Sequence, residues 1–199
     1  MGGSTVVLAT RNVGKVRELG RILGPAVDIV GLEKFSGAPE VAETGATFEE
    51  NALLKARAIA AYTGLPAVAD DSGLCVDALN GMPGIFSARW AGRHGDDKAN
   101  LDLVLAQVAD VADSRRGAHF YCAAAFVAGT VEYAVSGRVE GRLLRGPRGD
   151  GGFGYDPIFL PDGFTVTTAE MTAEEKDAIS HRGKAFRALV PLITGSLTA

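Results

Sequence analysis

Apolar residues in the first part of the chain follow two spacings, one typical of strands and one typical of helices. The β-branched runs at Thr5–Ala9 and Val27–Leu32 predict two short buried strands. Between them, apolar positions recur at helical spacing over 16–23, and Gly24-Pro25 is expected to stop this helix. The apolar stripe consists of Val16, Leu19, Ile22 and Leu23, and it leaves out Arg17, Glu18 and Arg21.

The middle of the chain continues the alternation of helix and strand. Thr47 and Glu50 have the spacing of a capping box, so we predict a helix that starts there and runs through an alanine-rich stretch to Gly64. The apolar segment Ala67–Ala69 then predicts a short strand. This strand is expected to end where the polar sequence Asp70-Asp71-Ser72-Gly73 begins.

Two longer apolar segments, Ala118–Ala128 and Val131–Leu144, predict strands joined by a turn at Gly129-Thr130. We expect this hairpin to form the core of a second lobe. The glycine-rich stretch Gly146–Gly154 follows it as a flexible loop, of a kind that often carries function.

Two more helices are expected in the second half of the chain. One of Asp96-Asp97 caps the first of them, and Thr172 with Glu175 forms a capping box at the start of the last one. The last helix is expected to run towards Leu192, with a break near Ser180. Strands alternating with helices predict an α/β fold, and the hairpin makes its sheet mixed.

Composition and charge limit the classes of protein to which this chain can belong. The 199 residues, of which 47 % are hydrophobic and 22 % charged, fit one domain or two small lobes over 1–199. The net charge of −4 disfavours a broad basic surface for nucleic acid. Cys75 and Cys122 lie among apolar neighbours without the spacing of a zinc site. The N-terminus lacks the charged and apolar regions of a signal peptide, and no apolar run reaches the ~20 residues that span a membrane, so we expect a cytoplasmic protein. Met1–Ser4 reads as a flexible leader.

The segment between the first predicted strand and helix combines groups that suit phosphate. It consists of Thr10, Arg11, Asn12, Val13, Gly14 and Lys15. A helix N-terminus offers unpaired N–H groups and the positive end of the helix dipole, and Lys15 adds a charge. The spacing of a Walker A loop is absent. The alternative is an ordinary connection with a solvated lysine, and these residues alone favour neither.

Asp70 and Asp71 follow an apolar strand, at the place where open α/β sheets bind ligands. Two carboxylates that become buried there are costly without a cation. Such carboxylates commonly hold Mg²⁺ that also contacts a substrate phosphate, while a second one can act as general base towards water. The alternative is a polar turn, since Asp, Ser and Gly all favour turns, but the apolar strand before them favours function.

Three further groups of residues indicate a nucleotide site only when they are considered together, because each alone has an ordinary structural explanation. Phe153-Gly154-Tyr155-Asp156 could stack a nucleobase on an aromatic ring, or be a turn with two core aromatics. Lys176 and the pair His181-Arg182 could reach over a bound nucleotide, or form a solvated face. By default, Glu43 favours a nearby helix N-terminus and Lys55 is a solvated lysine.

Taken together, these motifs resemble the inosine/xanthosine triphosphate pyrophosphatase family, also called non-canonical purine NTP pyrophosphatases. The matching segments, in the family's order over nearly the whole chain, are VVLATRNVGKVREL, ETGATFEENALLKA, PAVADDSGLCVDAL, GIFSARWAG, GGFGYDPIF and EEKDAISHRGKAF. Each is weak alone, whereas the ordered set is highly specific. The resemblance implies a two-lobed α/β fold with a long mixed sheet flanked by helices, and a homodimer. It also implies Mg²⁺-dependent hydrolysis of ITP, dITP and XTP to the monophosphate and pyrophosphate.

The resemblance further implies a role for each residue on the phosphate side. Thr10 to Lys15 match the family's phosphate-binding turn, and Lys55 matches a lysine near the triphosphate. Asp71 matches the general base and metal ligand, and Asp70 is its acidic neighbour and a further candidate ligand. Ser72 matches a substrate contact.

On the base side, the resemblance implies that Phe153 to Asp156 form the pocket for base and sugar. Lys176, His181 and Arg182 match nucleotide contacts, the last two near the base.

This chain departs from the family's pattern at two places. The family often has glycine where Arg11 stands, so arginine would be strained if the backbone there had φ above zero. Many relatives have two acidic residues where this chain has Ala42 and Glu43, which leaves Glu43 as the candidate there for a second metal ligand.

Three other functions fit parts of the pattern. The first is a nucleotide pyrophosphatase that acts on other substrates, such as modified pyrimidine triphosphates. The second is a catalytically idle nucleotide sensor, which the Asp70-Asp71 pair disfavours because a sensor needs no base. The third is a phosphate-donor kinase, which the missing Walker A pattern disfavours.

Overall fold

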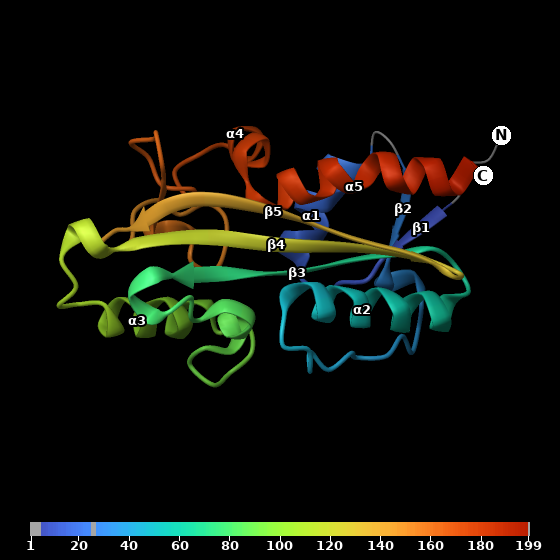
Figure 1. Ribbon diagram of the computed structural model, residues 1–199, viewed down its shortest axis with the longest axis horizontal. Helices are drawn as coiled ribbons and strands as arrows, with labels where there is room; N and C mark the ends of the chain where they lie inside the picture. The colour runs from blue at the N-terminus through green and yellow to red at the C-terminus, as the bar shows by residue number, and fades with distance from the viewer. Residues whose placement is uncertain (1–4, 25–26, 199) are drawn as a thin grey trace. The chain divides into compact units, whose positions relative to one another are not determined.

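Six strands form one sheet in the order β2-β1-β3-β4-β5-β6 in the computed structural model, which describes residues 5–24 and 27–198 (Figure 1). Parallel pairing joins β1 to β2 and to β3, and antiparallel pairing joins β5 to β6, so the sheet is mixed as predicted. The strands are β1 (Thr5–Leu8), β2 (Asp28–Gly31), β3 (Ala67–Val76), β4 (Gly117–Ala128), β5 (Val131–Leu143) and β6 (Phe159–Pro161).

Helices separate most of these strands along the chain, which confirms the α/β class. They are α1 (Val13–Leu23), α2 (Phe48–Thr63), α3 (Asp97–Gln107), α4 (Ala173–Ile179) and α5 (His181–Thr198). Within the described ranges, no helix combines the length and the apolar character that crossing a membrane requires. The predicted leader, Met1–Ser4, and Pro25 lie outside the described residues.

The ends of α2 follow from its sequence. The Thr47 hydroxyl accepts a hydrogen bond from the N–H of Glu50, which confirms the predicted N-cap. The Glu50 carboxylate reaches one residue further back than in a capping box and accepts from the N–H of Ala46. Gly64 ends the helix at a φ of 68°, a left-handed conformation that glycine adopts at no steric cost.

The last two helices also begin where the sequence predicts. Thr172 and Glu175 make a complete capping box at the start of α4. The predicted break near Ser180 is confirmed, because Ser180 ends α4 in extended conformation and α5 begins at the next residue. Beyond the break, α5 continues past Leu192 to Thr198.

The chain divides into two compact units. Unit 1 comprises the described residues of 1–71, 122–137 and 182–199, and unit 2 comprises 72–121 and 138–181. The hairpin of β4 and β5 contributes to the core of unit 2, as expected, and it also contributes residues to unit 1. Long strands can serve two cores because each end packs against its own helices.

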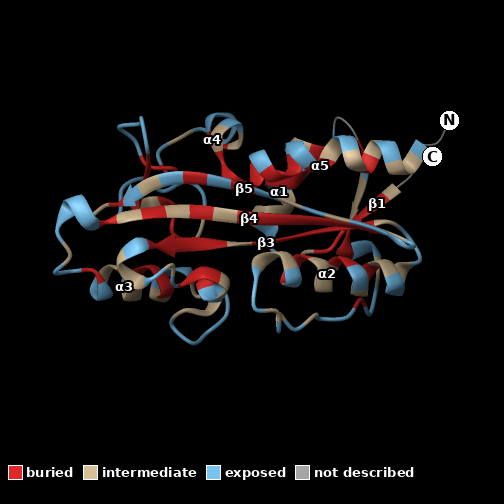
Figure 2. Cartoon of the chain, in the orientation of Figure 1, coloured by how far each residue is buried: buried red, intermediate tan, exposed pale blue. Residues whose placement is uncertain are grey.

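Helices cover both faces of the sheet in unit 1 (Figure 1). On one face, α1 and α5 bury Leu19, Leu23, Phe186 and Leu189 against Leu8 and other strand residues. On the opposite face, α2 packs its small buried side chains (Figure 2). Because both faces are covered, β1 and the unit 1 parts of β3 and β4 are buried nearly throughout, which fits their largely apolar sequences. The other two strands of this unit, β2 and the first part of β5, are largely exposed or half-buried.

Unit 2 has its own core. Leu101, Val104 and Val108, which lie on or directly after α3, pack with Leu74, Val76 and the aromatic rings of Phe120 and Phe159. The two phenylalanine rings meet at 4.6 Å between their centroids. This core supports the segments that follow β5, including the glycine-rich stretch and β6.

Candidate active site

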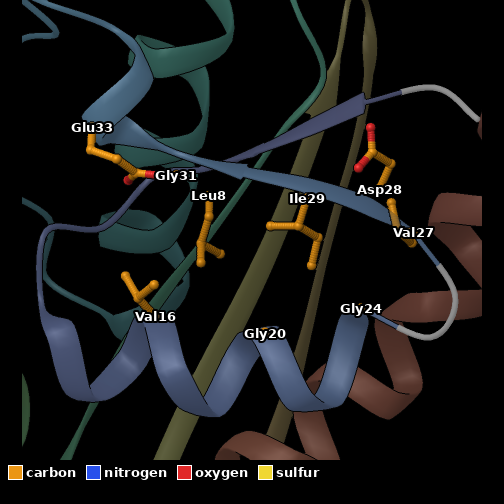
Figure 3. A pocket seen from close by; sticks show the side chains of 9 residues that line it. All are labelled: Leu8, Val16, Gly20, Gly24, Val27, Asp28, Ile29, Gly31 and Glu33. Atoms are coloured by element: carbon orange, nitrogen blue, oxygen red, sulfur yellow. The ribbon is translucent and has the colours of Figure 1, made fainter.

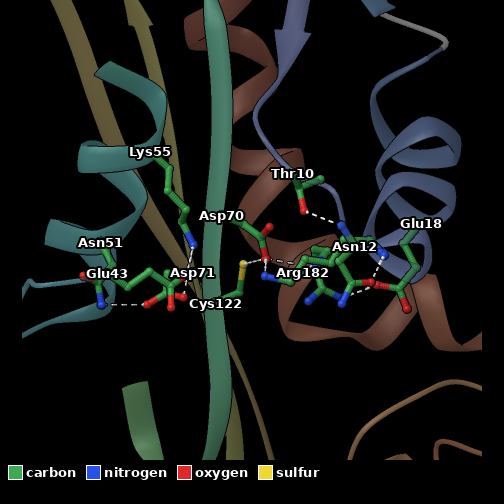
Figure 4. Close-up of polar contacts among 11 residues, drawn as sticks. Thr10, Asn12, Glu18, Glu43, Asn51, Lys55, Asp70, Asp71, Cys122 and Arg182 are labelled. Atoms are coloured by element: carbon green, nitrogen blue, oxygen red, sulfur yellow. Dashed lines mark hydrogen bonds and ion pairs between the residues drawn. The ribbon is translucent and has the colours of Figure 1, made fainter. Parts of the chain in front are cut away.

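Asp70 and Asp71 lie inside a strand. The strand predicted over Ala67–Ala69 continues through the polar residues to Val76. The expectation that it ends at Asp70 was therefore wrong, and so was the alternative of a polar turn at this place. Successive side chains of a strand point to opposite faces of the sheet. Asp70 therefore points towards α1 and α5, and Asp71 points towards α2 (Figure 4). The carboxylates are tolerated inside the sheet because each has its own cationic partner.

The position of Asp70 follows from the register of β1 and β3. Leu8, the last residue of β1, pairs with Val68, so β3 extends past the carboxyl end of β1. Beyond Leu8 the chain turns into α1 at Asn12, next to the carboxylate of Asp70 (Figure 4). This is the edge at which α/β sheets bind their ligands.

The carboxylate of Asp70 contacts two cations. Its Oδ2 lies 3.0 Å from Nζ of Lys15 and 3.2 Å from Nε of Arg182. The thiol of Cys122, 3.9 Å away, donates to the same oxygen. Burial by itself would raise the pKa of Asp70, but the charges of Lys15, Arg182 and Lys55 outweigh burial and hold this pKa well below its ordinary value. Asp70 is therefore ionised at neutral pH.

Arg182 joins two buried carboxylates. Its Nη1 also pairs with Glu18 of α1, and both side chains are almost fully buried. Sequence reasoning left Glu18 outside the apolar stripe and missed this pair, whose members are 164 residues apart. The resemblance placed Arg182 near the base. The structure places its guanidinium in unit 1 against Asp70 and Glu18, and the base contact stays a prediction.

A different set of groups surrounds Asp71. The side-chain amide of Asn51 donates to its Oδ2 at 3.1 Å, and Nζ of Lys55 lies 3.3 Å from its Oδ1. Lys55 also pairs with Glu43 at 2.6 Å. Burial raises the pKa of Asp71 above its ordinary value; Lys55 opposes this effect and Glu43 adds to it. Asp71 thus holds a proton more readily than Asp70 does.

Lys55 responds to the same surroundings in the opposite sense. Burial would lower the pKa of its ammonium, but the charges of Asp71, Asp70 and Glu43 outweigh burial and raise it. Sequence reasoning considered Lys55 but assigned no role to Asn51. Asn51 and Lys55 are spaced i, i+4, so they share one face of α2, a helix that packs against the sheet. This spacing is the sequence signal that could have identified Asn51 as a site residue.

Glu43 and Asp71 have the chemistry of a magnesium site. Their carboxylates meet at one cation, the ammonium of Lys55, and Mg²⁺ prefers such hard oxygen ligands. The described part of the chain contains no group of three or more His, Cys, Asp or Glu side chains arranged to hold a metal. The residues therefore fit an ion held by one or two carboxylates and completed by substrate phosphate and water.

The turn from β1 to α1 is ordered by its own polar residues. The side chain of Asn12 accepts a hydrogen bond from the N–H of Lys15 at 3.1 Å, and the Thr10 hydroxyl accepts from the N–H of Asn12 at 3.2 Å. The turn continues into the first turn of α1, where Val13 is exposed and Gly14 half-buried. The amino end of α1 and Lys15 thus share one place with Asp70, as a phosphate-binding turn requires.

Arg11 makes a different contact from the rest of this turn. Asn80 is the non-glycine residue with positive φ among those described, so Arg11 does not carry the backbone strain that a left-handed conformation would impose. Its guanidinium instead donates to the carbonyl oxygen of Ala38 at 2.6 Å.

Unit 2 gathers the residues predicted for the base side. Nζ of Lys176 lies 5.1 Å from the centroid of the Phe153 ring and 2.5 Å from Oδ2 of Asp156. The imidazole of His181 stacks on the ring of Phe120 at 4.8 Å. The buried Tyr155 donates its hydroxyl to the carbonyl of Ser87 at 2.8 Å, which makes it a core residue. Gly154 donates its N–H to Asp97.

Ser72 lies next to the aspartate pair, whereas the pocket of unit 1 lies apart from the predicted site residues. Ser72 follows Asp71 in β3 and is the first residue of unit 2. A pocket of about 700 Å³ lies between α1 and β2 (Figure 3). It is lined by Leu8, Val16, Gly20, Gly24, Val27, Asp28, Ile29, Gly31 and Glu33, and so by none of the predicted site residues.

Comparison with known proteins gives the family. The sequence profile of the Ham1 family matches residues 6–192. A dITP/XTP pyrophosphatase of Streptomyces coelicolor is 66 % identical over 193 residues, which cover 94 % of this chain and 96 % of the relative. The chain belongs to the Ham1 family, and the family resemblance drawn from its motifs is confirmed.

Solved structures agree with this assignment. The crystal structure of a nucleoside-triphosphatase / dITP/XTP pyrophosphatase from Mycobacterium abscessus is 55 % identical and covers 94 % of this chain and 99 % of that one, with a TM-score of 0.76. A HAM1 protein from Coxiella burnetii is 42 % identical and covers 96 % and 99 %, with a TM-score of 0.86.

Proposed function

We propose that this chain is a nucleoside triphosphate pyrophosphatase that hydrolyses dITP, XTP and ITP to the monophosphate and pyrophosphate, with Mg²⁺ as cofactor. The observation that carries this proposal is the pair of adjacent buried carboxylates on opposite faces of β3. Asp70 contacts Lys15 beside the β1–α1 turn, and Asp71 contacts Lys55, which also pairs with Glu43. The names of the relatives, dITP/XTP pyrophosphatases, support the substrate class.

Asp71 is the general base of the proposed reaction. Its raised pKa makes it a better proton acceptor than an ordinary aspartate, and the Asn51 amide and the Lys55 ammonium fix the orientation of the carboxylate. In this role Asp71 takes a proton from the water that attacks the triphosphate. Mg²⁺, held by Asp71 and Glu43, would neutralise charge on the phosphate oxygens.

Asp70 has a positioning role in this proposal. Its carboxylate contacts Lys15 and Arg182 on the opposite face of β3, so the geometry favours Glu43 and Asp71 over Asp70 as metal ligands. Lys15 extends from α1 at the turn predicted to bind phosphate, and Asp70 fixes its ammonium there. The amino end of α1 adds the positive end of its dipole.

The residues proposed to contact the base lie in unit 2. The ring of Phe153 offers a surface on which a purine can stack, and Lys176 and His181 offer hydrogen-bond donors. A 6-keto oxygen accepts such a hydrogen bond, whereas the 6-amino group of adenine leaves the donor unpaired. Sites that demand a hydrogen bond reject the wrong partner by a factor on the order of 10⁴.

The remaining expectations belong to the same proposal. We propose that the enzyme is a cytoplasmic homodimer that does not bind nucleic acid. The support for these points is the family resemblance, the net charge of −4 and the two buried free cysteines, which suit a reducing compartment.

A pyrophosphate-release assay tests the function. Wild type is given dITP, XTP, ITP, ATP and GTP, each with Mg²⁺ and with a chelator instead. We expect release from the first three in the presence of Mg²⁺ only. Faster turnover of a modified pyrimidine triphosphate would assign the enzyme to the other substrate class, and binding without turnover would assign it to the sensors.

Asp71→Asn tests the catalytic assignment. Loss of the base should lower kcat at least about 100-fold while the fold is kept, because asparagine can still accept from Asn51. Asp110→Asn, at an exposed position, is the matched control and should turn over normally. Near-normal turnover by folded Asp71→Asn would contradict the assignment.

A further inference from the structure

Asp156 is buried in unit 2, and its carboxylate connects three separate segments. Its Oδ2 accepts the N–H of Phe153 at 2.8 Å and pairs with Nζ of Lys176 at 2.5 Å. Its Oδ1 accepts the hydroxyl of Thr168 at 2.8 Å. The donors come from the glycine-rich stretch, from α4 and from the segment Thr167–Glu170. One carboxylate therefore fixes these three segments relative to one another.

This arrangement determines where Lys176 lies. A buried ammonium needs a paired anion, since burying an unpaired charge is very costly. Asp156 supplies the anion for Lys176, and the same oxygen holds the backbone of Phe153. The ammonium is thereby held over the Phe153 ring, with 5.1 Å between Nζ and the ring centroid.

The glycine-rich stretch comes close enough to Asp156 because of its glycines. Gly152 has a φ of +71°, and a Cβ at this position would lie 2.1 Å from Oδ2 of Asp156. Next to it, Gly151 donates its N–H to the carbonyl of Ala169 at 3.0 Å. A side chain at Gly152 would push the stretch away from the carboxylate that accepts the N–H of Phe153.

The segment Thr167–Glu170 fixes the start of the same stretch. The Thr167 hydroxyl donates to the carbonyl of Arg148 at 2.8 Å, and the N–H of Arg148 donates to the carbonyl of Pro157 at 2.8 Å. The Arg148 guanidinium pairs with Glu170 at 2.8 Å. Hydrogen bonds thus hold the predicted loop Gly146–Gly154 at several points, and its flexibility stays a prediction.

We infer that Asp156 is a positioning residue supported by Thr168: its carboxylate holds Phe153 and Lys176 in place for the base. The resemblance matched Asp156 with the base and sugar pocket, but here both of its oxygens accept hydrogen bonds from the chain's own donors. Thr168, which lies outside every matched motif, becomes a determinant of base binding. The inference rests on the proposed function, because it assigns Phe153 and Lys176 to a nucleobase.

Thr168→Val removes the supporting hydroxyl and keeps the shape of the side chain. Thr168→Ser restores the hydroxyl, and Thr165→Val is the control at an exposed threonine of the same unit. For each variant we would measure KM and kcat for dITP, the Kd of dITP without divalent metal, and inhibition by tripolyphosphate, which has no base. Thermal unfolding checks the fold, and Thr168→Ala is a second variant should valine not be accepted.

We expect Thr168→Val to raise KM and Kd for dITP roughly three- to tenfold, the effect of one hydrogen bond to a charged acceptor that acts through another residue. Its kcat and the Ki of tripolyphosphate should stay within about twofold of wild type, because the triphosphate side is untouched. Serine should restore KM, and Thr165→Val should match wild type. This split separates a positioning role from a general loss of structure.

Several results would overturn the inference. They are an unchanged Kd for dITP in folded Thr168→Val, an equal loss for dITP and tripolyphosphate, or no rescue by serine. Wild type that binds dITP without releasing pyrophosphate would refute the proposed reaction, and the Kd values would still decide on Thr168. Wild type that neither binds nor hydrolyses dITP would overturn both.

Discussion

Arg182→Ala should destabilise the protein strongly, because it removes the cation between two buried carboxylates. The guanidinium is 2 % exposed and pairs with Asp70 and Glu18. After truncation, Asp70 keeps Lys15 at 3.0 Å, whereas Glu18 loses the guanidinium. Removing one partner of a buried ion pair costs about 3–5 kcal/mol. For a chain of this length, that corresponds to a fall in Tm of about 6–20 °C.

Urea unfolding of wild type and variant measures this loss directly. Arg17→Ala is the matched control, since Arg17 lies on α1 in the same unit with an exposed side chain and its removal should change the free energy of unfolding by less than about 0.5 kcal/mol. Adding Glu18→Gln to Arg182→Ala removes the negative charge that had paired with the guanidinium and should recover part of the loss. A loss below about 1 kcal/mol for Arg182→Ala would refute the reasoning, because the carboxylates would then not depend on Arg182.

The burial of Arg182 affects the interpretation of kinetic constants measured for Arg182→Ala. A free cationic donor near the base could be deleted with little effect on folding. The buried guanidinium of this structure cannot, so lost activity in Arg182→Ala includes the consequences of a displaced Asp70 and Lys15. Stability must be measured before any effect on KM is assigned to the base.

Two further predictions concern stability. Gly20→Ala should raise the free energy of unfolding, measured in urea, by about 0.5–1 kcal/mol, because Gly20 lies in α1 and a Cβ there meets no atom within 4 Å. A lower free energy of unfolding would contradict this and show that the helix needs glycine at this position. Burial, and then the charge of Arg138, lowers the pKa of His119, so the unfolded chain binds more protons and stability is lost as the pH falls through about 6.5. Unfolding at pH 7.5 and 5.5 should therefore show a smaller drop for His119→Gln than for wild type, and equal drops would contradict this sign.

Local signals in the sequence predicted the elements well. Thr47, Thr172 and Gly64 fix the helix ends through contacts with residues only a few positions away, so their effect can be read from spacing alone. The β-branched run at β1 and the hairpin turn at Gly129-Thr130 are local in the same sense. Apolar periodicity likewise identified the buried face of α1.

The length of β3 and the burial of Glu18 could not be predicted from neighbouring residues in the sequence. A polar sequence such as Asp70-Asp71-Ser72-Gly73 favours a turn unless distant partners neutralise it. Here the partner Arg182 is 112 residues from Asp70 and 164 residues from Glu18. Only the folded chain brings these charges together, so no window of sequence contains the reason why the strand continues.

The alternation of side chains along β3 gives the adjacent aspartates different chemistry. Asp70 points to a face where Lys15 and Arg182 lower its pKa and keep it ionised. Asp71 points to the other face, where burial and Glu43 raise its pKa against the effect of Lys55. A site in which two titratable groups are pushed apart in this way assigns the acid–base role to one of them. In the proposed reaction Asp71 is that group, because the two cations that contact Asp70 stabilise its ionised form and make it a weaker proton acceptor.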